Sequence, residues 1–351
     1  MELTINKLLQ TVVENRSSDL HILTDEVPRI RIDGQLEQLD LPKLNTDTVK
    51  TFLYSILDSN QKKIFEETNE LDFAIYIPGV GRFRANYYVE RKRLGAAFRI
   101  IPTEIPSLED LNQPPIMYEF AKYEKGLILV TGPTGSGKST TMAALINEIN
   151  ENQKKHIITI EDPIEFQHEN KRSIFSQREV GYDTKTFADG IKYAMRQDPD
   201  VILIGEMRDS ETIRAALTAA ETGHLVIGTL HTNSAVQTIN RIINVFPETE
   251  QEMIRTQLSM TLKGVVSQIL VPKTSGGRVA IQEILVNTPA IANIIREDKL
   301  PQIKSQMELN QANTLMQTQK GEFVKYVQQN EITRETALQF SSDKSELSKS
   351  I

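Results

Sequence analysis

The sequence predicts an α/β protein of two domains, and three observations support that prediction. The chain has 351 residues, which exceeds the usual size of a single domain. In its second half, short apolar strands alternate with helices, as in a mainly parallel sheet that is covered on both faces. Between residues 101 and 115 four prolines interrupt the pattern, and we interpret this segment as a linker.

Residues 1–100 predict a small N-terminal α+β domain. Apolar residues recur at helical spacing up to Asn15. Five strands are then expected, at 19–23, 28–33, 71–77, 82–89 and 94–101. The last three are separated by glycine-rich and charged turns, which predict a meander.

Residues 116–340 predict the α/β domain. Strands are expected at 127–131, 156–161, 201–206 and 225–230, and helices at 138–150, 186–196 and 209–222. Residues 234–270 are predicted to be helical, residues 278–286 to be a strand, and residues 289–338 to be mainly helical. The last eleven residues, 341–351, include five serines and several charges and are predicted to be a flexible tail.

Composition excludes several classes of protein. The 40 basic and 47 acidic residues give a net charge of -7, which argues against wholesale binding of nucleic acid or anionic lipid, although local basic patches remain open. The absence of cysteine excludes disulfides, thiolate zinc sites and cysteine nucleophiles. Apolar runs are too short to span a bilayer, and the N-terminus does not resemble a signal peptide. We therefore expect a cytoplasmic protein.

A glycine-rich loop follows the strand at 127–131. Residues 132–139, GPTGSGKS, fit the pattern G-x-x-x-x-G-K-[ST] between a strand and a helix. In such a loop backbone N–H groups surround the β-phosphate of ATP or GTP, the lysine reaches the β and γ oxygens, and the hydroxyl of Ser139 binds Mg²⁺. The predicted nucleotide-binding residues are Gly132, Pro133, Thr134, Gly135, Ser136, Gly137, Lys138, Ser139 and Thr140.

Acidic residues follow two other predicted strands. Glu206 comes after the apolar run 201–204 and an intervening glycine, and it is our candidate for orienting the attacking water. Glu161, Asp162 and Glu165 end the strand at 156–161, at the sheet edge where open α/β folds bind ligands. These three carboxylates need a cation. Together with Glu206 they are candidate ligands of Mg²⁺, directly or through water. The alternatives are an acidic loop and a surface carboxylate without a role in chemistry.

Two of the five histidines bracket one predicted strand. His224 and His231 would lie about 23 Å apart in a straight strand, so they cannot share a metal ion. His231 follows the carboxyl end of the strand, where it could donate a hydrogen bond to a γ-phosphate. A structural role, as a hydrogen-bonded histidine, remains the alternative for both.

Four segments, in this order, resemble the secretion ATPase superfamily. They are the glycine-rich loop, IEDPIEF, DPDVILIGEMRD and TGHLVIGTLHTNSA, which correspond to the Walker A, Asp box, Walker B and His box of that superfamily. The resemblance covers nearly the whole chain, from the SDLH at 18–21 through GRFR at 81–84 and FRIIP at 98–102 to the C-terminal helices. It is nearest to the ATPases that retract type IV pili.

The resemblance implies a fold, an assembly and further site residues. It implies a PAS-like N-terminal domain, a RecA-like ATPase domain with C-terminal helices, and a hexameric ring in which domains of neighbouring subunits pack together. Arg84 and Arg99 would be arginine fingers and, with Glu206, Glu161 and His231, complete the candidate catalytic set. Both arginines belong to a basic stretch, Arg82, Arg84, Arg91, Lys92, Arg93 and Arg99. A solvated charged hairpin and a nucleic-acid patch are the alternatives.

Two features favour the retraction type. Related secretion and pilus-assembly ATPases typically carry a four-cysteine zinc module and extra N-terminal domains, whereas this chain lacks cysteine. Residues 290–297, AIANIIRE, resemble the AIRNLIRE motif associated with retraction, and Ala292 stands where that motif has arginine. The same segment also fits an amphipathic helix with Ile291, Ile294 and Ile295 in a core.

The sequence thus predicts a cytoplasmic, hexameric, ATP-hydrolysing motor that uses Mg²⁺ and powers pilus retraction and twitching motility. Its expected partners are the other subunits, the inner-membrane platform protein of the pilus at the inner face of the membrane, and in some systems a second retraction ATPase, with no nucleic acid and no transmembrane segment. The alternatives are an accessory pilus ATPase and a nucleotide-gated scaffold that does not hydrolyse ATP. A scaffold would not need Glu206.

Overall fold

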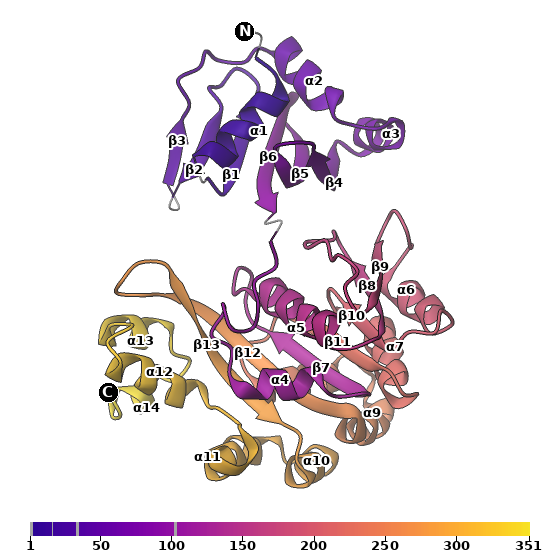
Figure 1. Cartoon of the computed structure of the whole chain (residues 1–351), viewed down its shortest axis with the longest axis vertical. Helices are drawn as coiled ribbons and strands as arrows, with labels where there is room; N and C mark the ends of the chain where they lie inside the picture. The colour runs from indigo at the N-terminus through magenta and orange to yellow at the C-terminus, as the bar shows by residue number, and fades with distance from the viewer. Residues whose placement is uncertain (1–2, 16, 33–34, 102–103) are drawn as a thin grey trace. The chain divides into compact units, whose positions relative to one another are not determined.

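The computed structural model describes residues 3–15, 17–32, 35–101 and 104–351, with the backbone alone for residues 310–313. The chain divides into two compact units (Figure 1). The first comprises Met1–Glu104 with Glu165–Gln167, and the second comprises Ile105–Ile164 with His168–Ile351. Of the predicted linker, residues 102–103 lie outside the described residues, and the segment from Ile105 onward belongs to the second unit.

The first unit is a six-stranded antiparallel sheet with three helices. Its strands are β1 (Asp19–Leu23), β2 (Arg29–Ile32), β3 (Gln35–Gln38), β4 (Glu70–Ile77), β5 (Gly81–Glu90) and β6 (Arg93–Ile101), in the spatial order β3-β2-β1-β6-β5-β4. Its helices are α1 (Ile5–Glu14), α2 (Thr46–Ser55) and α3 (Ser59–Thr68). The predicted meander is β4-β5-β6, whereas α2, α3 and β3 were not predicted.

The two faces of this sheet differ in chemistry. On one face Leu20, Phe98, Ala85 and Phe73 lie abreast on neighbouring strands and pack against all three helices. Tyr87 is fully buried there, and its hydroxyl donates to the Leu53 carbonyl at 3.1 Å. Because successive residues of a strand point to opposite faces, the residues next to this apolar row form a second row on the other face. That second row consists of Arg31, Asp19, Arg99 and Arg84.

The second unit contains a seven-stranded sheet in the order β13-β12-β7-β11-β10-β8-β9. The strands are β7 (Gly126–Thr131), β8 (His156–Glu161), β9 (Ile174–Glu179), β10 (Val201–Ile204), β11 (Leu225–Leu230), β12 (Leu262–Pro272) and β13 (Arg278–Val286). All neighbouring pairs from β12 to β9 are parallel, and β13 is antiparallel to β12. The predicted α/β fold class is confirmed by this topology.

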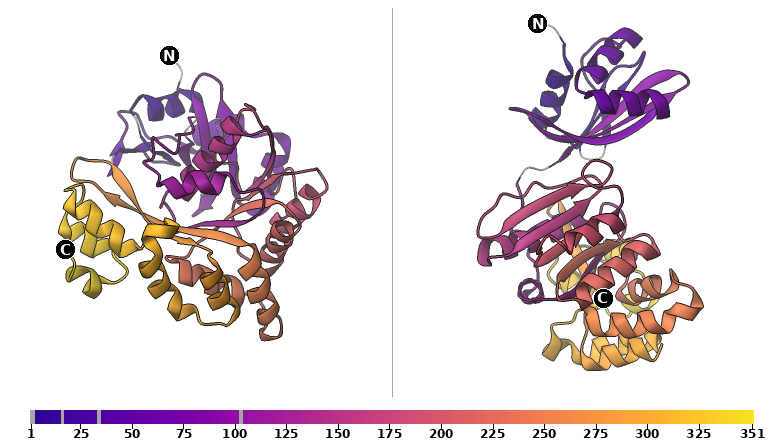
Figure 2. Two further views of the ribbon diagram at one scale, coloured as in Figure 1. Left: turned by 60° about the horizontal axis from the view of Figure 1, so that its bottom comes forward. Right: turned by 90° about the vertical axis from the view of Figure 1, so that its right-hand side faces the viewer.

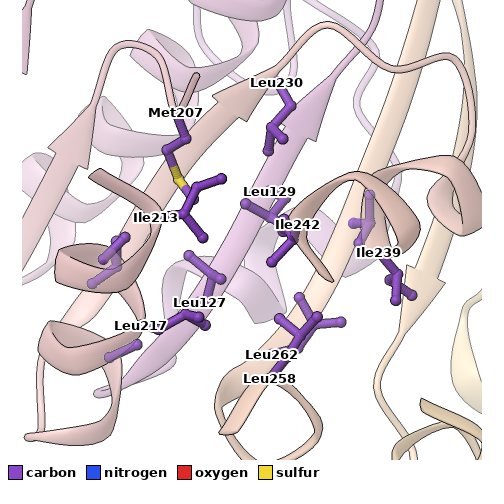
Figure 3. Close-up of a cluster of buried hydrophobic side chains, with 14 of the residues drawn as sticks. Leu127, Leu129, Met207, Ile213, Leu217, Leu230, Ile239, Ile242, Leu258 and Leu262 are labelled. Carbon is purple, nitrogen blue, oxygen red and sulfur yellow. The ribbon is translucent and has the colours of Figure 1, made fainter. Parts of the chain in front are cut away.

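Helices cover both faces of the large sheet. They are α4 (Pro115–Ala121), α5 (Lys138–Asn152), α6 (Phe187–Ala194), α7 (Ser210–Glu221), α8 (Ala235–Asn244) and α9 (Glu248–Thr261). Leu127 and Leu129 of β7 face α7, α8 and α9 (Figure 3), while Ile128 and Val130 face α4 and α5 on the other side. Burial on both faces explains why β7 is apolar throughout.

The prediction of helix over 234–270 is wrong for its last part. The structure has α8 and α9 up to Thr261 and then the strand β12, which pairs with β7. Residues 262–271, LKGVVSQILV, include six apolar side chains, four of them β-branched, as expected for a strand that is buried on both faces. A short run of this kind cannot be assigned to helix or strand by periodicity. The strand β9 was also not predicted.

The C-terminal segment is helical. It comprises α10 (Pro289–Arg296), a short 3₁₀ turn (Leu300–Gln302), α11 (Ile303–Thr314), α12 (Gln319–Gln328), α13 (Arg334–Phe340) and α14 (Lys344–Ser348). Figure 2 shows the last three helices, in yellow, beside the β12–β13 hairpin, where they share a small core with Val271 and Ile281. Within the described residues no helix combines the length and apolar character that crossing a membrane requires.

Residues 341–351 were predicted to be a flexible tail, and the structure differs. Leu347 of α14 is fully buried, and the Asp343 side chain caps the helix by accepting a hydrogen bond from the Glu346 backbone N–H at 3.0 Å. Glu346 also pairs with Lys304 of α11 and with Lys320 of α12, the latter at 2.9 Å. One apolar anchor and one shared carboxylate therefore fix a segment whose composition alone is typical of a mobile end.

We expect Glu346→Gln to loosen α14. Hydrogen bonds from Lys304 and Lys320 lower the pKa of Glu346 to about 2. A lowered pKa in the folded state means that the ion pairs stabilise the fold above pH 4.5 and are lost as the pH falls toward 2. The substitution should remove them at neutral pH and speed hydrogen exchange of residues 343–350. Glu335→Gln, at an exposed position on α13, is the control, and equal exchange in both variants would contradict this account.

Candidate nucleotide site

The glycine-rich loop lies between β7 and α5. Gly132, Gly135 and Gly137 have φ values of 144°, 77° and 84°, a region that L-residues with side chains rarely adopt. At Gly132 a Cβ atom would lie 2.1 Å from the backbone oxygen of Gln268. Backbone geometry and close packing therefore both require glycine at this position.

Gly132→Ala should destabilise the second unit and weaken nucleotide binding. The backbone of Gln268 cannot move away cheaply, so we expect a loss of about 1–3 kcal/mol in the free energy of unfolding. Gly135→Ala is the matched control, because nothing lies within 4 Å of its Cβ position and only the cost of its positive φ remains. Thermal unfolding and ADP titration of both variants check the prediction, and an equal effect of the two would contradict it.

Lys138 is held against the loop at the first residue of α5. Its side chain is buried, and Nζ donates to the carbonyls of Gly132 at 2.9 Å and Pro133 at 3.0 Å. The N-cap of α5, Gly137, provides no side-chain acceptor for the first-turn N–H groups. The N–H groups at a helix N-terminus, together with a lysine cation, suit an anion such as phosphate. Ser139 and Thr140 follow in the same first turn and are half-buried.

The other candidate residues of this unit follow strands that end at the same edge as β7. Glu161 ends β8, Glu206 follows β10 and His231 follows β11. The strand β11 lies between β7 and β10, so His231 comes between the glycine-rich loop and Glu206 along the edge. The ends of β8 and β10 are also abreast, because the Gly205 N–H donates to the Ile160 carbonyl at 2.8 Å. Four separate segments of the sequence thus meet at one edge.

Glu206 has two cationic or hydrogen-bonding neighbours. Its Oε1 atom accepts from Nε of Arg208 and lies 3.2 Å from Nε2 of His231. The hydrogen bond to Glu206 raises the pKa of the Arg208 guanidinium. Only 18% of the Glu206 side chain is exposed, so its carboxylate is fixed rather than freely solvated. Two residues for which the sequence predicted separate roles, Glu206 and His231, are thus in direct contact.

Glu161 is positioned by its own strand and by β9. Its Oε1 atom accepts from the Thr159 hydroxyl at 2.7 Å and from Nε2 of Gln177 at 3.5 Å. Glu179 of β9 accepts from the Ile164 N–H at 3.1 Å and so holds the loop that follows Glu161.

The other two acidic candidates have different surroundings, and the charge of Asp162 contributes to the raised pKa of Arg208. Asp162 is exposed, and Glu165 belongs to the first compact unit. Across the described residues no three acidic or histidine side chains form a metal-binding group. Glu161 ends β8 and Glu206 follows the neighbouring strand β10, so these two candidates lie on adjacent strands at the sheet edge.

His224 lies at the opposite end of β11 from His231. Its Nδ1 atom is 2.9 Å from the Ala219 carbonyl and 3.3 Å from the Thr222 hydroxyl, at the end of α7. These contacts fit the structural alternative for His224.

The two arginine candidates are neighbours in the first unit. Arg84 and Arg99 are directly opposite each other on β5 and β6 and so share a face of the sheet. Each is paired within the unit. Arg84 binds Asp72 with two hydrogen bonds of 3.1 and 2.6 Å, and Arg99 donates to Asp19 at 2.7 Å. Burial alone would raise the pKa of Asp19, but hydrogen bonds from Ser18 and Arg99 outweigh it and lower the pKa.

The remaining basic residues of the stretch occupy other environments. Arg91 and Lys92 form the β5–β6 turn with positive φ values of 47° and 65°, and Arg93 follows them. Arg82 is buried on β5. The basic stretch is therefore not one continuous patch, and Arg84 and Arg99 form a separate pair.

Comparison with known proteins assigns the chain to a family. The profile of the Type II/IV secretion system protein family matches residues 104–335. The chain is 49% identical to the type IV pilus retraction ATPase PilT of Pseudomonas aeruginosa over 304 residues, 87% of this chain and 88% of that protein. It is 40% identical to the type IV pilus ATPase PilU of the same organism over 342 residues, 97% of this chain and 89% of that one.

A solved structure agrees over the whole length. The crystal structure of the pilus retraction motor PilT with bound ADP matches with a TM-score of 0.93 and 47% identity, over 99% of this chain and 100% of that chain. The chain belongs to the PilT-type ATPases of the type II/IV secretion family. The sequence-based assignment to the secretion ATPase superfamily is thus confirmed.

Several contacts of this PilT-type site were not predicted from the sequence. Arg208 was part of the Walker B segment but was given no role, and its position two residues after Glu206 was the available signal. Asp19 and Asp72 bind the two arginines, yet only the strand register reveals it. Gln268, which packs under the glycine-rich loop, lies on the strand that was predicted as helix.

Proposed function

We propose that this chain is an ATP-hydrolysing motor that powers retraction of type IV pili, working as a hexameric ring. The observation that carries the proposal is its similarity to the PilT retraction motor over the full length of both chains. The contacts at the sheet edge support a hydrolytic role, because they combine a phosphate-binding loop with a fixed carboxylate and a histidine.

The glycine-rich loop is the proposed site for the triphosphate. Backbone N–H groups of the loop and of the first turn of α5 bind the β-phosphate, and Lys138 exchanges its contacts with Gly132 and Pro133 for phosphate oxygens. Mg²⁺ fits the chemistry of the oxygen groups present: the Ser139 hydroxyl would hold it, and Glu161 and Glu206 are the candidate carboxylate ligands, directly or through water. When bound, the ion neutralises phosphate charge.

Glu206 and His231 supply the proposed chemistry at this edge. Glu206 orients the water that attacks the γ-phosphorus and takes up its proton, and the bond to the β–γ bridging oxygen breaks to give ADP and phosphate. The neighbouring His231 donates a hydrogen bond to the γ-phosphate and, through its contact with Glu206, registers the loss of that group. Arg208 holds Glu206 in place before the nucleotide arrives.

Arg84 and Arg99 are the proposed arginine fingers, contributed by a neighbouring subunit. Both guanidinium groups lie on the charged face of the six-stranded sheet. Each is hydrogen-bonded to a carboxylate, so each is oriented before it binds phosphate. When Arg84 and Arg99 leave Asp72 and Asp19 to bind a nucleotide, hydrolysis would become coupled to movement of one domain relative to that of the next subunit. In the cell we place the ring in the cytoplasm at the inner membrane, bound to the platform protein of the pilus.

Two measurements test this proposal. The purified chain should hydrolyse ATP with Mg²⁺ present, and cells that lack the gene should extend pili without retracting them. An accessory ATPase is the second candidate, because the similarity to PilU covers a slightly larger share of this chain than the similarity to PilT. Retraction that persists without this gene, while the purified chain still hydrolyses ATP, would favour the accessory role. No turnover of ATP would refute both.

A further inference from the structure

A line of three glutamine side chains connects the glycine-rich loop with the segment that enters the second unit. Gln268 lies on β12, Gln282 on β13, and Gln113 just before α4. The Nε2 atom of Gln282 donates to Oε1 of Gln113 at 2.8 Å and to Oε1 of Gln268 at 3.1 Å. We call these three side chains the amide relay.

Gln268 lies against the glycine-rich loop with both its side chain and its backbone. Its Nε2 atom donates to the Ser136 carbonyl at 2.8 Å, its backbone oxygen occupies the space that a side chain at Gly132 would need, and Nε2 lies 3.3 Å from the Cβ position of Gly137. The strand register explains this closeness. Ser267 pairs with Thr131, the last residue of β7, so Gln268 is level with the start of the loop.

The opposite end of the Gln268 amide is fixed as well. Its Oε1 atom accepts from the Thr141 hydroxyl of α5 at 3.0 Å in addition to the bond from Gln282. Reversing this amide would set its NH₂ group against the NH₂ group of Gln282 and its oxygen against the Ser136 carbonyl, so one orientation alone satisfies all partners. Gln268 is 1% and Gln282 3% exposed, and water therefore cannot replace a lost partner.

These contacts indicate that the amide relay does more than fill space in the core. An apolar side chain would fill the same volume in β12 at lower cost, since burying amides is favourable only when every group is paired. We propose that Gln268 is a positioning residue that holds the glycine-rich loop ready for phosphate, and that Gln282 and Gln113 couple the loop to the segment 105–114. The phosphate part of this inference rests on the nucleotide binding proposed above.

The mechanism follows from the direction of the bonds. Gln268 keeps the Ser136 carbonyl turned toward β12, and the Gly137 N–H, which lies in the same peptide plane, therefore points the opposite way, where the phosphate is proposed to bind. If residues 105–114 moved, Gln113 would displace Gln282. The Gln268 side-chain oxygen would then lose the hydrogen bond from Gln282, one of the two that it accepts. The glycine-rich loop and residues 105–114, which begin the second unit, would thereby influence each other in both directions.

Hydrogen exchange and ADP titration test the proposal. In the nucleotide-free protein, Gln268→Met should speed exchange of amides in residues 132–141, and it should weaken binding of Mg·ADP about tenfold. Gln113→Met, at a half-buried position, should produce a smaller change of the same kind. Gln257→Met is the matched control, because that glutamine bonds to Glu221 instead, and it should leave both quantities unchanged.

The outcomes are separable. Unchanged exchange of residues 132–141 in Gln268→Met would overturn the inference, whatever happens to ATP turnover. Loss of folding in Gln268→Met moves the decision to Gln113→Met, where unchanged exchange in residues 132–141 would also overturn it. Faster exchange in the loop, combined with a wild-type protein that binds ADP but does not hydrolyse ATP, would support the relay while refuting the proposed motor.

Discussion

Replacing Glu206 with glutamine is expected to lower ATP turnover about 10²- to 10⁴-fold, the usual contribution of a positioned acid–base group. The amide has nearly the same shape as the carboxylate, so the fold and the loop should be preserved, but it cannot accept the proton of the attacking water. Nucleotide affinity should therefore remain near the wild-type value. Steady-state phosphate release and an ADP titration measure the two quantities separately.

Glu211→Gln is the control for this substitution. Glu211 is an exposed glutamate in the first turn of α7, five residues after Glu206, and no chemistry is assigned to it. Arg208→Met adds a graded test, because it removes a hydrogen bond to Glu206 and leaves the carboxylate in place. We expect an intermediate loss of turnover there. Full activity in Glu206→Gln would show that another group activates the water.

Local sequence signals predicted that most residues of the candidate nucleotide site would lie at one edge of the sheet. The glycine-rich loop, Glu206 and His231 follow strands that are short, apolar and separated by helices, and this pattern places their carboxyl ends at one edge. The loop needs no tertiary information, since positive φ at three glycines and a lysine at the start of α5 are local properties. These features could be read from spacing alone.

Other features depend on contacts between distant segments and could not be predicted. β12 is a strand because it pairs with β7 on one side and with β13 on the other. Its sequence in isolation fits either a helix or a strand. Gln268 could not be recognised without that strand, because its partners Ser136, Thr141 and Gln282 are remote in sequence. The carboxylates that hold Arg84 and Arg99 likewise follow from strand register, which the order of residues does not specify.

The proposal that neighbouring subunits share the site leads to the second large prediction. Arg84→Ala should reduce turnover about 10³-fold or more if the arginine stabilises the transferring phosphoryl group. Its partner Asp72 is 40% exposed, so the variant leaves no buried charge and should fold. Lys138→Ala should abolish turnover through loss of phosphate binding, and Arg91→Ala, in the exposed β5–β6 turn, should be nearly silent.

Mixing the two inactive variants in one ring distinguishes a shared site from a site within one subunit. An Arg84→Ala subunit keeps an intact glycine-rich loop, and a Lys138→Ala subunit keeps an intact arginine. With equal amounts and random assembly, about a quarter of the head-to-tail interfaces would combine the intact loop with the intact arginine. Turnover should therefore recover well above that of either variant alone, after the subunits have been exchanged. If both groups acted within one chain, every subunit would remain defective, and the mixture would be as inactive as its components.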